Sequence, residues 1–88
     1  MTVRIVAVAI VFGTEVWIGD HFKERHAHVI HRHVMATGKS GSGHQGFLGS
    51  DGQFYGRREA LSIADHAGQL LRPAGLNEAI GLFSEDVW

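Results

Sequence analysis

The chain opens with a hydrophobic pattern that predicts a β-hairpin. Residues 3–12 are almost wholly apolar and rich in β-branched side chains, which is typical of a strand that lies centrally in a sheet or is covered on both faces. Residues 13–14 fit a tight turn, because glycine tolerates the positive φ that such turns need. Residues 15–18 then alternate, with Val16 and Ile18 on one face, so they predict an antiparallel return strand.

The next apolar periodicity predicts a helix over residues 22–37, which ends at Gly38 as a C-cap. Apolar positions recur every three to five residues and are expected to face the sheet. They are Phe22, Ala27, Ile30, Val34 and Thr37. His26 and His33 flank this stripe. The polar outer side holds His28, His31, Arg32 and Met35.

The second half repeats the same order of elements. Residues 45–49 and 53–55 predict two short strands, joined by the strong turn signal of an Asp-Gly pair. A helix is expected over residues 57–69, and residues 77–83 fit a short extended or turn segment. The second helix has a core stripe of small and apolar residues: Ala60, Ile63, Ala64, Ala67 and Leu71.

These elements predict a compact two-layer α+β domain in the order ββαββα, with an antiparallel sheet of two hairpins and two helices. Eighty-eight residues are enough for one core, so residues 1–88 are expected to form a single domain. A core this small makes a homo-oligomer plausible. The apolar run at the start is far shorter than the ~20 residues of a membrane helix, so no membrane association is expected.

Composition and charge narrow the function classes. The chain has no cysteine, which excludes a disulfide framework and a thiolate metal site and is compatible with a reducing cytoplasm. A formal net charge of −1 argues against strong duplex nucleic-acid binding driven by electrostatics. Seven histidines add positive charge below about pH 6.5.

The glycine-rich segment that follows the first predicted helix imitates two nucleotide-binding motifs. Residues 41–46 match G-x-G-x-x-G, but that fingerprint needs a preceding strand and a following helix, and here the order is reversed. Residues 38–40 read Gly-Lys-Ser like the end of a P-loop, yet His33 stands where the first glycine is required. We interpret the segment as a loop whose backbone N–H groups are able to meet an anion.

A cluster of ionisable residues stands out on the first predicted helix, where residues 25–33 hold four histidines and two arginines. Three interpretations remain open: solvent-facing or packing histidines, contacts to phosphates or bases, and a metal site completed by a third ligand such as His21, His44 or Asp20. Catalysis would need an acid–base pair such as His44 with Asp51, brought together by the fold. No serine has a nucleophile context, so the chain is expected not to be an enzyme.

Several short motifs resemble a family of small phage and prophage accessory proteins, most of them without an assigned activity. The resemblance covers nearly the whole chain after residue 12. It includes the pair Arg25 and His26, the run Gln45-Gly46-Phe47 and the C-terminal Ser-Glu-Asp-Val-Trp, which in the family usually ends Ser-Glu-Asp-Leu-Trp. The histidines at positions 28, 31 and 33 are additions to the family pattern. The resemblance implies a phage origin and a site of action in the host cytoplasm.

A phage origin favours a non-enzymatic binding protein that counters host defence. We expect it to sequester a nucleotide-like anionic signalling ligand, such as a cyclic or ADP-ribose-like nucleotide, without a cofactor. The candidate ligand-binding residues are Arg25, His26, Lys39, Gln45, Phe47, Phe54 and Arg57.

Two other functions remain open. The first is a protein–protein inhibitor of a host or CRISPR-type defence component, which makes contact through Glu85, Asp86 and Trp88. The second is a small histidine-ligated metal-binding protein. A purely structural interpretation also exists, in which Arg25 or Arg57 pairs with the acidic tail and Trp88 closes the core.

Overall fold

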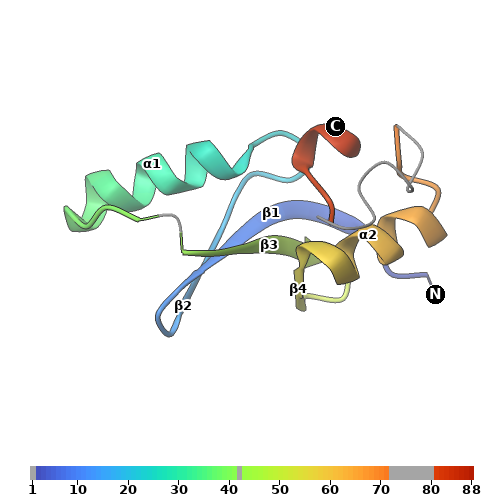
Figure 1. Cartoon of the computed structure of the whole chain (residues 1–88), viewed down its shortest axis with the longest axis horizontal. Helices are drawn as coiled ribbons and strands as arrows, with labels where there is room; N and C mark the ends of the chain where they lie inside the picture. Colours follow the sequence, from blue (N-terminus) through green and yellow to red (C-terminus); the bar gives the residue numbers. More distant parts are fainter. Residues whose placement is uncertain (1, 42, 72–80) are drawn as a thin grey trace.

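Four strands form one antiparallel sheet in the order β2-β1-β3-β4 in the computed structural model, which describes residues 2–41, 43–71 and 81–88 (Figure 1). The strands are β1 (Ile5–Phe12), β2 (Glu15–Ile18), β3 (His44–Gly49) and β4 (Phe54–Gly56). The helices are α1 (His26–Thr37), α2 (Arg57–His66) and the C-terminal 3₁₀ turn η2 (Ser84–Asp86). The structure confirms the predicted two-layer ββαββα fold. None of the described helices is long and apolar enough to cross a membrane.

β1 is a central strand, as its continuous apolar run predicted, because it pairs with β2 on one side and β3 on the other. Its register against β3 shifts near the start: Ile5 pairs with Gly49 but Ala7 already pairs with Leu48. Because of this extra residue, the side chains at the start of β1 point to the opposite face of the sheet from the one they would have in a regular strand. Ile5 therefore joins Val8 and the rest of the buried core instead of facing the opposite side.

The helices and the C-terminal segment share one hydrophobic core on a single face of the sheet. Figure 1 shows α1 and the C-terminal turn above the strands, with α2 in front of β3 and β4. The core residues, all buried, are Ile5, Val8, Ile10, Val29, Phe47, Ala60, Leu61, Ala64 and Leu82. The C-terminal segment is part of this core through Leu82, whose backbone N–H donates to the Arg57 carbonyl at 2.8 Å.

The first helix begins later than predicted and buries a different stripe. Phe22 has a positive φ of 56°, and Arg25 is extended, so the helical turns start only at His26. The buried residues of α1 are His26, Val29 and His33, whereas Phe22 is 51% exposed. The prediction that an apolar stripe through Phe22 and Ala27 faces the sheet was therefore wrong. His26, Val29 and His33 do so instead.

The second helix is shorter than predicted. It ends at His66, where Gly68 takes a left-handed conformation (φ 70°) and the Gln69 N–H donates back to the Ala64 carbonyl. The Gln69 side chain then binds both the N–H and the carbonyl of Ile5, each at 2.7 Å. Leu71, predicted as core, is 67% exposed, and Leu61 is buried. Most of the segment predicted over residues 77–83 lies outside the described residues.

Candidate functional site

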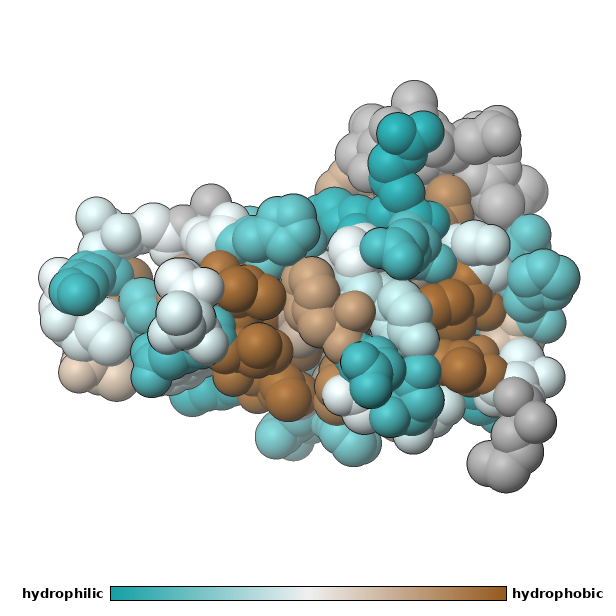
Figure 2. Space-filling model, turned by 90° about the horizontal axis from the view of Figure 1, so that it is seen from below, coloured by the Kyte–Doolittle hydropathy of each residue, from teal (hydrophilic) through white to brown (hydrophobic). Residues whose placement is uncertain are grey.

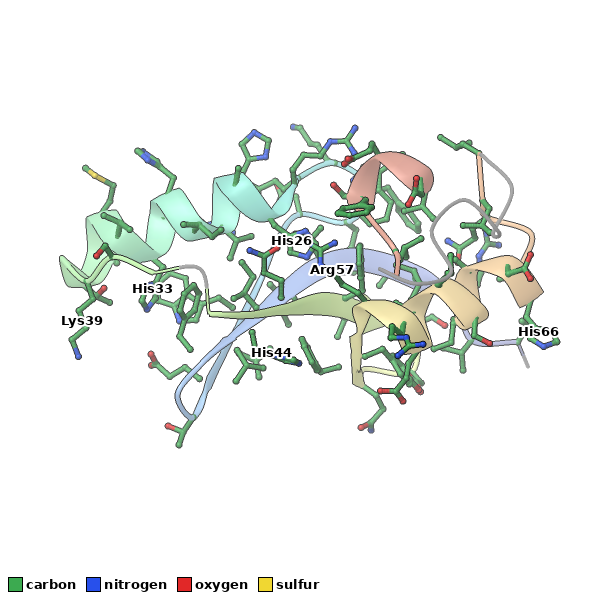
Figure 3. The ribbon with its side chains drawn as sticks, in the orientation of Figure 1. His26, His33, Lys39, His44, Arg57 and His66 are labelled. Atoms are coloured by element: carbon green, nitrogen blue, oxygen red, sulfur yellow. The ribbon has the colours of Figure 1, made fainter. Side chains whose placement is uncertain are left out.

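Four of the predicted ligand-binding residues come together where α1, β3, α2 and the C-terminal turn meet. They are Arg25 at the start of α1, His26 one residue later, Gln45 on β3 and Arg57 at the start of α2. Figure 3 shows His26 and Arg57 near each other above the centre of the sheet. We call this group the Arg25–Arg57 site.

Arg57 connects three segments through its guanidinium group. Nη2 donates to Gln45 Oε1 at 2.5 Å, and Nη1 donates to the Leu82 carbonyl at 2.6 Å. The same group stacks over the Phe83 ring, 4.8 Å from its centroid. Burial lowers the pKa of Arg57, and the charges of Glu85 and Asp86 oppose that shift. Arg57 stays charged and holds the C-terminal segment against β3.

His26 is a buried histidine whose ring belongs to the core. Its Nε2 lies 2.7 Å from the Gly46 carbonyl, so the ring donates from Nε2. The ring also meets the edge of Phe47, with centroids 5.0 Å apart. Burial lowers the pKa of His26 below its ordinary value of 6.5, although the Gly46 bond favours the protonated form. His26 is consequently neutral at pH 7 and adds no charge to the site.

Arg25 is the accessible cation of the site. Its Nη1 donates to Ser84 Oγ at 3.2 Å and lies 3.9 Å from Glu85 Oε2, at the limit of an ion pair. The side chains of Arg25 and Glu85 are 38% and 60% exposed. A pair this long and this open to water contributes little stability, so an incoming anion is able to compete with Glu85.

The acidic tail is held in the way the structural interpretation proposed. Trp88 Nε1 donates to the Glu24 carbonyl at 3.3 Å, and its ring contacts Phe22 and Phe47 edge-on. Asp86 is fully buried, and its Oδ2 accepts the Phe83 N–H at 2.9 Å. Of the three predicted tail contacts, Glu85 is therefore the exposed one and Trp88 closes the core.

Three predicted ligand-binding residues lie elsewhere. Phe47 is fully buried beneath His26 and has no exposed ring face. Phe54 pairs with Leu48 and contacts His44 on the opposite face of the sheet. Lys39 follows the far end of α1, and Figure 3 shows it well away from Arg57. No stacking aromatic from the predicted set thus reaches the Arg25–Arg57 site.

Lys39 lines a separate cavity of about 400 Å³ below the end of α1. The cavity is bordered by the β1–β2 hairpin and the glycine-rich loop, and its described lining includes Phe12, Glu15, His33 and Thr37. His33 stacks on Phe12 with ring centroids 3.6 Å apart. Within the described chain, His33 Nδ1 is the buried side-chain polar atom without a hydrogen-bond partner. The sequence pattern gave no sign of this stacked pair, because Phe12 and His33 are 21 positions apart.

The remaining histidines of α1 have local roles or face solvent. His28 Nδ1 accepts the Arg25 N–H at 2.9 Å and so closes the first turn, where no acidic residue stands.

Arg32 binds Glu24 through Nη1 at 2.5 and 2.6 Å. Among the described residues, no three histidine, aspartate or glutamate side chains are placed to hold a metal ion. Asp51 accepts from Tyr55 Oη and the Gln53 N–H.

Residues 4–88 match the family model of the phage T4 y16D protein. The chain belongs to this family. The match covers nearly the whole chain, so the phage origin that the short motifs indicated is confirmed. The description of the family states no activity, ligand or partner. No curated protein and no solved structure matches the chain.

Proposed function

We propose that this y16D-family chain is a non-enzymatic binding protein that acts in the host cytoplasm and sequesters a nucleotide-like anion at the Arg25–Arg57 site. One observation carries the proposal: two arginines and the first turns of two helices come together above the centre of the sheet. The first turn of a helix bears exposed N–H groups and partial positive charge, which favour phosphate.

The two arginines have different roles in the proposal. Arg57 is held in place by its hydrogen bonds to Gln45 and the Leu82 carbonyl, so it supplies a fixed positive charge and a rigid frame. Arg25 is half-exposed and weakly paired, so its guanidinium is free to form a bidentate contact with a phosphate group. Glu85 then acts as an internal competitor that occupies Arg25 in the absence of ligand.

Sequestration is favoured over catalysis because the groups at the site are donors and cations. His26 donates its Nε2–H to the Gly46 carbonyl, and the residue is only 7% exposed. A general base must reach the proton that it removes, and a buried imidazole is poorly placed to do so. The site therefore supports binding of an anion better than acid–base chemistry on it.

The test is a titration of the protein at low salt with ADP-ribose, a cyclic dinucleotide and inorganic phosphate, followed by calorimetry. We expect at least one nucleotide to bind, R25Q to weaken it about tenfold or more and E85Q to strengthen it. These effects follow because one change removes the phosphate contact and the other removes its competitor.

R32Q is the matched control, since Arg32 is an exposed arginine of the same helix and is bound to Glu24. It should leave the affinity within about twofold. Absence of binding by every probe, or equal effects of R25Q and R32Q, would contradict the proposal.

The second candidate is a protein–protein inhibitor of a host or CRISPR-type defence component. The exposed carboxylate of Glu85 on the C-terminal turn favours it. Capture of one defined host protein by the wild-type chain, unchanged by R25Q and lost in E85Q, would support this function over anion binding. The metal-binding alternative receives no support from the described residues.

A further inference from the structure

The face of the sheet opposite the helices is apolar, and its β2 edge is exposed at Val16 and Ile18. The pairing of Ala9 with Ile18, Val11 with Val16 and Leu48 with Phe54 places these side chains on that face, which we call the open sheet face. Its residues are Ala7, Ala9, Val11, Val16, Ile18, His44, Gly46, Leu48 and Phe54. Figure 2, seen from below, shows hydrophobic side chains gathered left of the centre of this side, with a second group farther right and paler and hydrophilic residues between them.

An antiparallel sheet whose second face meets water normally alternates apolar and polar residues. Here β1 is apolar at every position, and His44 is the ionisable residue that the described strands place on the open sheet face. Val16 and Ile18 are 49% and 44% exposed. The sequence of β1 is thus that of a strand covered on both faces, and the helices cover one.

We propose that a second copy of this chain covers the open sheet face, so that two sheets stack in a two-fold β-sandwich. A symmetric contact places the same patch on both copies. His44 is the ionisable residue that the strands place on this patch, so two copies of the patch can meet without repulsion between carboxylates or between ammonium groups. A charged partner protein, in contrast, would find few charged side chains on the patch with which to form ion pairs.

The shape of the face suits stacking of two sheets. Its centre consists of the small residues Ala7, Ala9 and Gly46, of which both alanines are fully buried, and the Phe54 ring lies against Gly46. Sheets pack about 10 Å apart when small and β-branched side chains interdigitate. The larger side chains, Val16 and Ile18 on one edge and Leu48 toward the other, are placed to meet those of the partner.

Stacking is favoured over edge-to-edge pairing through β2. Arg32 Nη2 donates to the Ile18 carbonyl at 3.2 Å and so occupies an acceptor that a neighbouring strand would need. Edge strands are commonly blunted in this way. The face itself has no such obstruction among the described residues.

The size of the face sets the expected affinity. The four strands are 8, 4, 6 and 3 residues long, so at about 3.3 Å per residue and about 4.8 Å between strands the face spans on the order of 330 Å² per copy. A total of about 660 Å² is smaller than the ~1,000 Å² of a stable specific interface and is typical of a weak, transient contact. The dimer should therefore form only at concentrations on the order of 100 µM or more. The Arg25–Arg57 site lies on the other side of the sheet, so this inference does not depend on the proposed function.

Sedimentation equilibrium over about 1 µM to 1 mM tests the dimer. We expect a reversible monomer–dimer equilibrium for the wild type and a loss of at least tenfold in association for V16K and I18K. Met35 is the matched control, because it is 73% exposed but lies on α1, so M35K should associate like the wild type. Circular dichroism verifies that each variant is folded.

A second measurement does not depend on the folding of the lysine variants. The chain has no cysteine, so I18C and M35C each carry a single thiol. A short bis-maleimide should join I18C chains at concentrations where M35C chains stay single. A wild type that remains monomeric at 1 mM, equal association of V16K and M35K, or equal cross-linking of the two cysteine variants would overturn the proposal.

Discussion

His26 and His33 fill positions of α1 that an apolar residue would normally occupy. Both are 7% exposed, and each is packed against an aromatic ring, Phe47 or Phe12. A neutral imidazole that donates one N–H to a carbonyl, as His26 does to Gly46, buries at little cost. The histidine cluster therefore divides into two core residues and an outer group that caps the helix or faces water.

Arg57 and Arg58 offer a direct comparison of two adjacent arginines. R57M should lower the free energy of unfolding by about 2–4 kcal/mol, because it leaves Gln45 and the Leu82 carbonyl without their shared donor in a partly buried place. R58M should change it by less than about 0.5 kcal/mol, since Arg58 is exposed. Urea unfolding measures both values, and similar losses would refute the bridging role of Arg57.

At the scale of elements, β3 and β4 approach closely because β3 has glycine at position 46. A Cβ there would lie 2.7 Å from Phe54 Cε2 and would also collide with the Tyr55 carbonyl oxygen. The missing side chain lets Phe54 lie across the strand on the open sheet face. The adjacent Gly46 carbonyl is free to accept from His26 on the helical side. One glycine thus shapes both faces of the sheet.

G46A should destabilise the protein by about 2 kcal/mol or more, because the Tyr55 carbonyl cannot move without loss of strand pairing and the Phe54 ring would have to leave its packed position. Gly56 is the matched control: it faces Gly46 across the ladder, but its added Cβ would meet nothing nearer than Glu59 Oε1 at 4.0 Å. Thermal unfolding followed by circular dichroism should show a clear drop for G46A alone. Equal drops would disprove the close-approach argument.

At the scale of the whole molecule, the C-terminal segment joins elements that are far apart in sequence. Leu82 binds the Arg57 backbone, Asp86 accepts the Leu71 N–H through its carbonyl, and Trp88 reaches Glu24 at the approach to α1. These contacts cover the junction between α1 and α2. The stability of the Arg25–Arg57 site and that of the fold are coupled through this segment.

The free energy of unfolding should fall as the pH drops below about 6.5. The unfolded chain binds a proton at His26 near the ordinary pKa of 6.5, whereas burial lowers the pKa of His26 in the folded state. The unfolded state therefore binds more protons in this range, and stability rises with pH until it is complete above 6.5. The groups around His26 are the Gly46 carbonyl, the Phe47 ring, Arg57 and Glu85.

Urea unfolding between pH 7.5 and 5.5 checks this dependence. H26Q should flatten it, and H31Q, which changes an exposed histidine of the same helix, should keep it. Glu24 and Asp51 also have a lowered pKa, from Arg32 and Tyr55 respectively, but their contribution is lost only below their ordinary values of 4.5 and 3.8. A wild-type profile that is flat from pH 7.5 to 5.5 would contradict the role given to His26.

Much of the fold could be predicted from the sequence. Continuous apolar character indicated a central β1, glycine and Asp-Gly signals indicated both hairpins, and the first helix ended at the expected Gly38. The start of α1 was predicted too early, because Phe22 is apolar at helical spacing but takes a left-handed conformation. The prediction that Leu71 is core was wrong, because α2 ends before it.

The sequence by itself determined the order of the elements, the single small core and the phage family, because these depend on local periodicity, turn chemistry and short motifs. Only the tertiary structure decided which polar residues meet. It brought Arg25, His26, Gln45 and Arg57 together, but left Lys39 and Phe54 apart. It also left the apolar side chains of Val16 and Ile18 exposed on one sheet face. Such outcomes depend on strand register and helix placement, which periodicity along one chain does not encode.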